Sequence, residues 1–328
     1  MNKNSVVAGI VVGLGLTIVG VRACKASDGG VGVEEGIPKY AATQGVSGKL
    51  SAVGSDTLAD LFEQWFGAFK GMHPGVDPTY DPKGSGAAPK ALIDGTAVFG
   101  PMSREMKPEE ISSFEKKFGY KPTAVAVALD ALAIYVNKDN PIDKLTLQQA
   151  DAVFSATRKS GAPADITTWG QLGLTGEWAS HQINLYGRNS ASGTYSYFKE
   201  HVLAKGDFKA NVKEAPGIAT VVQNVTADRN GIGYSGIGYR TSGVKAVPIV
   251  GKDGTPYEAV AANVYSTKYP ISRALFVYVN RGPGQPLSPA VKEFLAFVLS
   301  RDGQEIVLKG GFVPLTSAMV TEYRAKLN

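Results

Sequence analysis

The recurrence of a short strand, a small-residue turn and a helix along this chain limits its fold more than any other feature. Residues 49–53 alternate as a strand, residues 54–55 form a turn, and apolar residues over 58–69 follow at helical spacing. Further units of this kind have their turns at 84–86 and 102–104. The alternation predicts an α/β fold, with helices packed on mostly parallel sheets.

Long β-rich runs at 131–137 and 274–280 lie far apart in the sequence. We interpret them as strands that cross between two lobes, because the chain leaves one pattern of units after the first run and returns to it at the second. Lobe I is then expected to hold residues 49–136 and 239–328, and lobe II residues 137–238. Such lobes form a cleft that can close around a ligand.

The N-terminal residues 1–23 resemble a secretory signal, with a weakly basic start, an apolar run and small residues near Ala23. The single cysteine, Cys24, follows directly and predicts lipidation as in a bacterial lipoprotein. Cleavage near Ala23 or Ala26 without lipidation, and an uncleaved membrane anchor, remain alternatives. Residues 24–48 are rich in small polar residues, so we expect a flexible tether there.

The overall charge excludes several classes of function. The chain of 328 residues carries a formal net charge of +5, and removal of Lys3 and Arg22 with the signal lowers it by two, to +3. This charge is too mild to indicate nucleic-acid binding. The three histidines are scattered without ligand spacing, and no serine or cysteine is paired with a base. We therefore expect no metal, no cofactor and no enzyme activity.

The segment around Arg188 predicts a seat for an oxyanion. Ser192, Gly193 and Thr194 lie where a predicted strand runs into a predicted helix, so their backbone N–H groups would be unpaired and would carry partial positive charge. The two hydroxyls add donors, and the planar guanidinium of Arg188 suits a tetrahedral anion. The alternative is that Ser192 or Thr194 only caps the helix.

Small hydroxyl residues occupy four predicted turns that precede helices, and one of these turns also carries a carboxylate. Any one of them alone is typical of a helix cap. Four in one α/β chain favour convergence around an anion that is held by neutral donors. The residues are Ser55, Asp56 and Thr57 in the first turn, Ser85 in the second, Ser103 in the third, and Ser192 and Thr194 in the fourth.

Together these residues resemble the periplasmic phosphate-binding proteins of high-affinity phosphate ABC transporters, which are type II periplasmic binding proteins. The similarity runs from Val53 to about Thr316. It implies two lobes, each a mostly parallel sheet flanked by helices, with two crossing strands as the hinge. It also implies an exported protein, periplasmic or on the outer surface, that binds inorganic phosphate as a monomer and delivers it to a membrane ABC permease.

By position, the family's phosphate contacts fall on the residues of these four turns, Gly193 included, and on Arg188. The chain departs from the family at Ser103 and Ser190, where the family has aspartates that accept the phosphate proton and brace the arginine. A carboxylate beside an anion is favourable only if the ligand donates a proton, so it selects phosphate over sulfate. We hypothesise that Asp56 restores this acceptor; the alternative is that Asp56 caps the helix that runs to Phe69.

Other functions remain open. The serine at position 103 makes a binder of another tetrahedral oxyanion, such as sulfate, the first alternative. An extracellular structural or adhesive protein on the same scaffold, or a phosphatase accessory, is the second.

Overall fold

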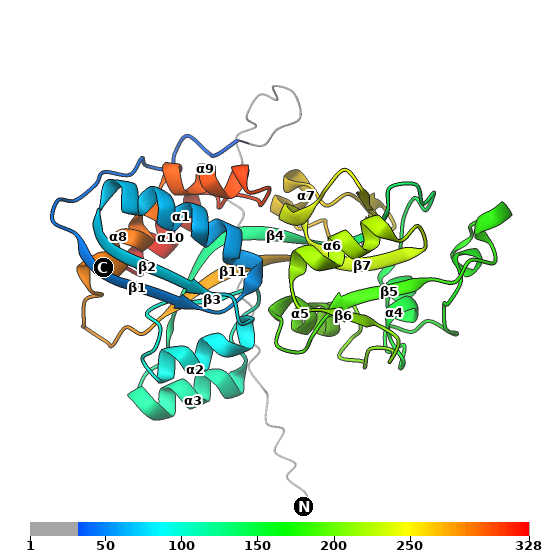
Figure 1. The fold of residues 1–328 in the computed structure, drawn as a ribbon, viewed down its shortest axis with the longest axis horizontal. Coiled ribbons are helices and arrows are strands. Elements are labelled where there is room, and N and C mark those ends of the chain that lie inside the picture. The colour runs from blue at the N-terminus through cyan, green and yellow to red at the C-terminus, as the bar shows by residue number, and fades with distance from the viewer. Residues whose placement is uncertain (1–31, 328) are drawn as a thin grey trace, which may run out of the picture. The chain divides into compact units, whose positions relative to one another are not determined.

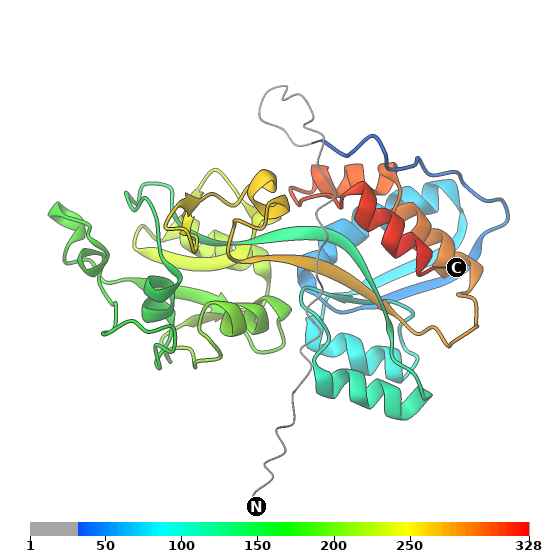
Figure 2. The ribbon, with the colours of Figure 1, turned by 180° about the vertical axis from the view of Figure 1, so that it is seen from behind.

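The computed structural model of the protein describes residues 32–327. The predicted signal segment and Cys24 lie outside these residues. The central elements of the fold are the strands β4 (Thr123–Asn137) and β11 (Ser272–Val279). They pair antiparallel, with Ser272 opposite Ala131 and Val279 opposite Thr123. Figures 1 and 2 show these strands running side by side from one group of elements to the other. They are the predicted crossing strands, and they are the connection that holds both lobes in one sheet.

The main sheet contains seven strands in the order β3, β11, β4, β7, β5 and β6, with β8 also paired to β4. Pairs that involve a crossing strand are antiparallel, whereas β5 pairs parallel with both β6 and β7. In lobe I, β1 and β2 form a separate parallel pair. The bounds are β1 Ser47–Val53, β2 Gly75–Asp81, β3 Gly100–Met102, β5 Asn184–Arg188, β6 Lys213–Ala215, β7 Gly231–Gly236 and β8 Val244–Ala246.

Helices cover the sheets in both lobes (Figure 1). Their starts follow local sequence signals: α3 begins with Pro108 at its first position, and Thr146 and Gln149 form the predicted capping box of α4. Lobe I carries α1 Ala59–Met72, α2 Ala88–Ile93, α3 Pro108–Phe118, α8 Pro289–Val298, α9 Arg301–Lys309 and α10 Ser317–Ala325. Lobe II carries α4 Leu147–Phe154, α5 Gly193–His201, α6 Ile218–Ala227 and α7 Ala261–Tyr265.

Each lobe has its own hydrophobic core, and β4 contributes to both. Residues 125–128 of β4 pack in the lobe I core, and residues 131–136 pack in the lobe II core. The lobe I core is rich in aromatic rings, because α1 turns Phe62, Trp65 and Phe69 to one face, where Phe62 and Phe69 meet Phe294 of α8. A rigid core on each side leaves the polar turns between the lobes as the place for a ligand.

The cores correct the predicted boundary between the lobes. Residues 137–238 were expected to form lobe II, with the chain returning to lobe I at 239. Apolar residues such as Val244, Ile249 and Tyr269 instead lie in the lobe II core. The reason is strand pairing, since β8 pairs with the second half of β4 and Ile249 bridges to Leu145. The chain returns to lobe I only along β11.

The described part of the predicted tether is packed onto lobe I. Residues 32–46 contain no helix or strand, yet Ile37 is buried in the lobe I core. The backbone N–H of Arg301 donates to the carbonyl of Pro38 at 2.8 Å, and that of Tyr40 donates to Asp302 at 2.8 Å. The few apolar residues in this polar segment are its anchors. No helix within residues 32–327 is long and apolar enough to cross a membrane.

Candidate anion-binding site

Arg188 lies at the carboxyl end of β5, where its guanidinium is almost entirely buried, with 2% of the side chain exposed. Nε donates to the carbonyl of Ala215 at 3.2 Å, and Nη2 donates to the carbonyl of Pro216 at 3.1 Å. These carbonyls follow β6, the parallel neighbour of β5, so the sheet itself orients the arginine. The guanidinium is held rigidly before any ligand is considered.

The carboxylate of Asp56 pairs with Arg188 from the opposite lobe. Nη2 donates to Oδ1 at 2.9 Å, and Nη1 lies 2.8 Å from Oδ2. Oδ2 also accepts from the backbone N–H of Ile218 at 3.0 Å. Nε and both hydrogens of Nη2 donate to protein acceptors, whereas Nη1 lies near Asp56 but makes no hydrogen bond within residues 32–327, so its two N–H groups are available to an anion. This arrangement favours a bracing role for Asp56 over the hypothesis that it reads a ligand proton.

Asp56 takes the place of the brace that the sequence lacks at position 190. Ser190 is exposed and has no carboxylate to offer. An aspartate at 190 would belong to the same lobe as Arg188, whereas Asp56 belongs to lobe I. Asp56 thus adds to the two lobe II carbonyls that already orient Arg188, and this ion pair depends on contact between the lobes.

The start of α5 combines the two interpretations of its sequence. Ser192 is the N-cap, and its Oγ accepts from the backbone N–H groups of Thr194 at 3.1 Å and Tyr195 at 3.3 Å. The N–H of Thr194 is therefore not unpaired, contrary to the sequence-based expectation, because the cap uses it. Among residues 32–327, none accepts from the N–H of Gly193. This N–H and the positive end of the helix remain as donors.

Hydroxyls from the four turns form two pairs, one of them across the lobe boundary. Thr57 Oγ1 and Thr194 Oγ1 are 3.2 Å apart, and Ser85 Oγ and Ser103 Oγ are 3.3 Å apart. The N–H of Ser103 donates to Ser85 Oγ at 3.1 Å. All four residues are fully buried. Buried hydroxyls need partners, so this cluster is suited to bind a polar ligand.

Gly193 brings the α5 turn into contact with the serine pair. A Cβ at this position would lie 2.2 Å from Ser85 Oγ and 2.5 Å from Ser103 Oγ. Nearby, the N–H of Gly86 donates to the carbonyl of Ala191 at 3.2 Å, again across the boundary. Only glycine fits at 193. The sequence placed Gly193 at a helix start but did not show that a side chain there would collide with the two serines.

Ser55 supports the first turn rather than contacting the other hydroxyls. Its Oγ accepts from the N–H of Thr57 at 3.2 Å and caps the short 3-10 helix Asp56–Leu58, and its own N–H donates to the carbonyl of Pro101 at 2.8 Å. The strand β3, which leads into the third turn, thus holds the first turn in place. Of the predicted residues, Ser55 and Ser192 act on the backbone of their own turns, and the remaining ones face the boundary between lobes.

Two tyrosines that the sequence analysis missed bind carbonyls of the first turn. Tyr80 donates to the carbonyl of Ser55, and Tyr239 lies 3.3 Å from the carbonyls of Asp56 and Thr57. Burial, reinforced by nearby carboxylates, raises the pKa of both phenols well above the ordinary value. Both therefore remain protonated donors. No local signal identifies them, because tyrosine in a buried strand or turn is ordinary.

A second buried ion pair, Asp130 with Arg273, lies beside Thr194 and was also missed. Arg273 Nη2 is 2.8 Å from Asp130 Oδ2 and 3.0 Å from Thr194 Oγ1. A sequence signal existed here. Each residue is charged and lies in an otherwise apolar strand, which is unusual unless the charge is paired.

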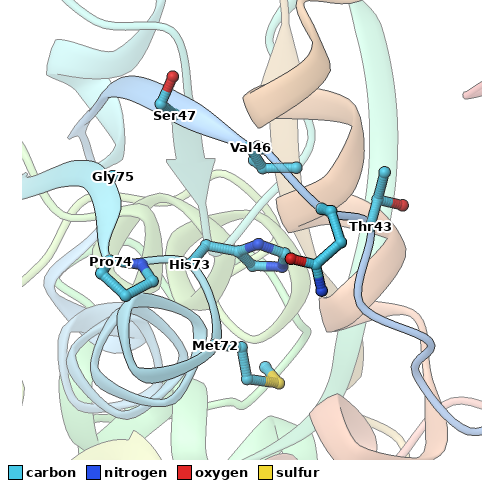
Figure 3. Close-up of a pocket in the computed structure, with 9 residues that line it drawn as sticks. Thr43, Val46, Ser47, Met72, His73, Pro74 and Gly75 are labelled. Atoms are coloured by element: carbon cyan, nitrogen blue, oxygen red, sulfur yellow. The ribbon is translucent and has the colours of Figure 1, made fainter.

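Two hollows lie near the surface of the described residues. One, of about 350 Å³, borders Arg188 and Tyr195 and is lined further by Lys209 and Glu214. The other, of about 270 Å³, lies where the segment before β1 meets the end of α1, next to His73 and Met72 (Figure 3). Tyr40 bonds to His73 and Glu293 beside it, which fastens that segment to lobe I. Of these two hollows, only the first is lined by Arg188.

Comparisons with known proteins agree with this geometry. Residues 40–302 match the PBP superfamily domain. The chain is 54% identical to the phosphate-binding protein PstS of Pseudomonas aeruginosa, over 86% of this chain and 88% of that one. It is 30% identical to PstS of Staphylococcus epidermidis, over 89% and 85%. A putative phosphate ABC transporter substrate-binding protein from Clostridium perfringens, solved with bound phosphate, superposes with a TM-score of 0.69 at 28% identity, over 82% of this chain and all of that one.

Proposed function

This chain belongs to the PBP superfamily, and within it to the family of the phosphate-binding proteins PstS, and on that premise we propose that it captures inorganic phosphate between its lobes and delivers it to a membrane ABC permease. The observation that carries the proposal is the meeting of the buried hydroxyls of Thr57, Ser85, Ser103 and Thr194, with Thr57 directly after the Asp56 that pairs with Arg188. Neutral donors and the two N–H groups of Arg188 Nη1 match the oxygens of a small tetrahedral anion.

Binding would follow from separation and renewed contact of the lobes. The turns now touch one another, so an anion enters only when the lobes part. Closure around it excludes water, and hydrogen bonds strengthen when water no longer competes. In this proposal Asp56 orients Arg188 on closure, and the protein performs no chemistry on the ligand.

The proposal also covers location and assembly. The predicted signal and Cys24 would take the protein across the cytoplasmic membrane and anchor it there by a lipid, with the packed segment 32–46 as its link to lobe I. We propose that it works as a monomer, because each phosphate needs both lobes of one chain. Mass spectrometry of the purified native protein would detect an acyl group on Cys24.

Sulfate is the second candidate ligand, favoured by one observation. Ser103 stands where the family has a carboxylate, and Asp56 is occupied by Arg188 and Ile218. Without a free carboxylate, a fully ionised anion meets no repulsion at the serine pair. Calorimetric titration of the purified protein with phosphate and with sulfate, near neutral pH, separates the candidates.

The titration also tests the arginine. We expect Arg188→Gln to weaken phosphate binding by about 100-fold, since it removes a charged donor and leaves Asp56 unpaired. The control is Arg229→Gln, because Arg229 forms an exposed ion pair with Glu177. Arg229 lies just before the start of β7, which pairs with the start of β5, whereas Arg188 lies at the other end of β5. Absence of binding by the unaltered protein would contradict the proposal and favour a structural or adhesive role.

A further inference from the structure

The buried pair of Asp130 and Arg273 has no part in the function proposed above. The two residues are direct partners in the antiparallel register of β4 and β11. Arg273 Nε and Nη2 donate to Asp130 Oδ2 at 3.0 and 2.8 Å, and the arginine and aspartate side chains are 2% and 0% exposed. Asp130 Oδ1 accepts from the N–H of Ile237 at 3.1 Å. Both carboxylate oxygens are thus satisfied, and the arginine is held in one orientation.

From this position Arg273 extends to the start of α5. Its Nη2 donates to Thr194 Oγ1 at 3.0 Å, and its guanidinium lies 5.4 Å from the ring of Tyr197, one turn further along the helix. Nη2 has two hydrogens, and one is directed at Asp130 and the other at Thr194. Arg273 therefore links the two crossing strands to the helix terminus that the oxyanion proposal uses.

The chemistry of the two groups decides the direction of the bond at Thr194. A guanidinium can only donate, so Thr194 Oγ1 must be the acceptor. A hydroxyl has a single hydrogen, and that of Thr194 is then left to donate elsewhere. Thr57 Oγ1, 3.2 Å away on the other lobe, is a neighbour that can receive it when the turns touch. Without Arg273, the same hydroxyl could equally accept from a ligand.

We propose that Arg273 is a positioning residue of the anion site: held by Asp130, it commits the hydroxyl of Thr194 to donate a hydrogen bond to an oxyanion between the lobes. The inference rests on the proposed function, because it assigns a role within the same site. It also describes the ligand oxygen at this point, which would act as the acceptor of the Thr194 hydroxyl.

A double-mutant cycle on the purified protein tests this, with calorimetric affinity for inorganic phosphate as the readout. One change is Asp130→Asn with Arg273→Gln, which replaces the charged pair by two amides and leaves no buried charge alone. The other is Thr194→Val, which removes the hydroxyl and keeps the shape. We expect each change to weaken binding by about 10-fold. Combined, they should weaken it no more than Thr194→Val does alone.

Additional variants keep the test decisive. Arg273→Lys keeps the charge beside Asp130 but loses the fork that reaches Thr194, so it should weaken binding even if the amide pair does not fold. Thr194→Ser should retain affinity, and Arg229→Gln serves as the charge-matched control. Wild-type affinity in the folded Arg273 variants, or additive losses in the cycle, would overturn the inference while the proposed function stands. No phosphate binding by the unaltered protein would overturn both.

Discussion

The two buried arginines beside α5 are paired in different ways, and the difference separates what is permanent in this site from what depends on the lobes. Arg273 and Asp130 lie opposite each other in one sheet. Arg188 and Asp56 are 132 residues apart and come from different lobes, and 12% of the Asp56 side chain is exposed. The first pair is built with the sheet. The second forms only when the lobes meet, so it can respond to a ligand.

The two ion pairs should differ most in the free energy of unfolding that is lost when each aspartate is removed. We expect Asp130→Ala to lower the free energy of unfolding by about 3–5 kcal/mol, because Arg273 would remain charged and buried. Asp56→Ala should lower it by only about 1 kcal/mol, since the lobes can separate and let water reach Arg188. Urea unfolding followed by tryptophan fluorescence measures both. Equal losses would mean that the two pairs do not differ as described.

Gly193→Ala acts on the contact between lobes alone. Its Cβ would collide with Ser85 and Ser103, and we expect a cost of about 1–3 kcal/mol to closure. Phosphate affinity should fall by about 10-fold or more, whereas the melting temperature should change little because neither core is touched. The control is Gly67→Ala in α1, where a Cβ meets nothing within 4 Å. A large drop in melting temperature for Gly193→Ala would contradict the contrast.

The substitution Asp56→Asn tests what the ion pair of Asp56 and Arg188 does for ligand binding. If Asp56 braces Arg188, phosphate and sulfate binding should weaken together, by about 10-fold, and their ratio should stay constant. If it reads the ligand proton, discrimination between the two anions should fall. Titrations with both anions decide, with Asp94→Asn as the control because Asp94 pairs with Lys90 on the exposed side of α2.

The smallest expected effect is on the pH dependence of stability, through a histidine close to Arg273 of the Asp130–Arg273 pair. His201 packs against Tyr197 with ring centroids 4.0 Å apart, and burial lowers the pKa of its imidazole, with the charge of Arg273 adding to this. The unfolded chain then binds a proton at higher pH than the folded one, so stability is lost as pH falls below about 6.5. His201→Gln should make the melting temperature decline less between about pH 7 and pH 5. Identical slopes would exclude this contribution.

Much of the fold could be predicted because its signals are local. Aromatic spacing in α1, the capping box of α4 and the β-rich runs each depend on neighbours in sequence. The boundary of lobe II could not be predicted, since β8 joins it by pairing with a strand about a hundred residues earlier. The packing of residues 32–46 was missed for the same reason. A few apolar anchors in a polar segment do not show which surface they meet.

The site divides in a similar way. The sequence predicted the hydroxyl turns and Arg188 as anion contacts from the helix starts that they precede, and their contact with an anion stays a prediction. The partner of Arg188 and the role of Arg273 were not. Ion pairs join residues by distance in space, and the sequence held several aspartates that could have been chosen.

By itself, the sequence determined the α/β layers, the two crossing strands and the chemical kind of the site, since periodicity, turn residues and side-chain chemistry are properties of short segments. Only the tertiary structure decided that Asp56 pairs with Arg188 from the other lobe, that Gly193 lies against Ser85 and Ser103, and that Arg273 donates to Thr194. These are contacts between distant segments, and they arise only when both cores pack and bring the turns together.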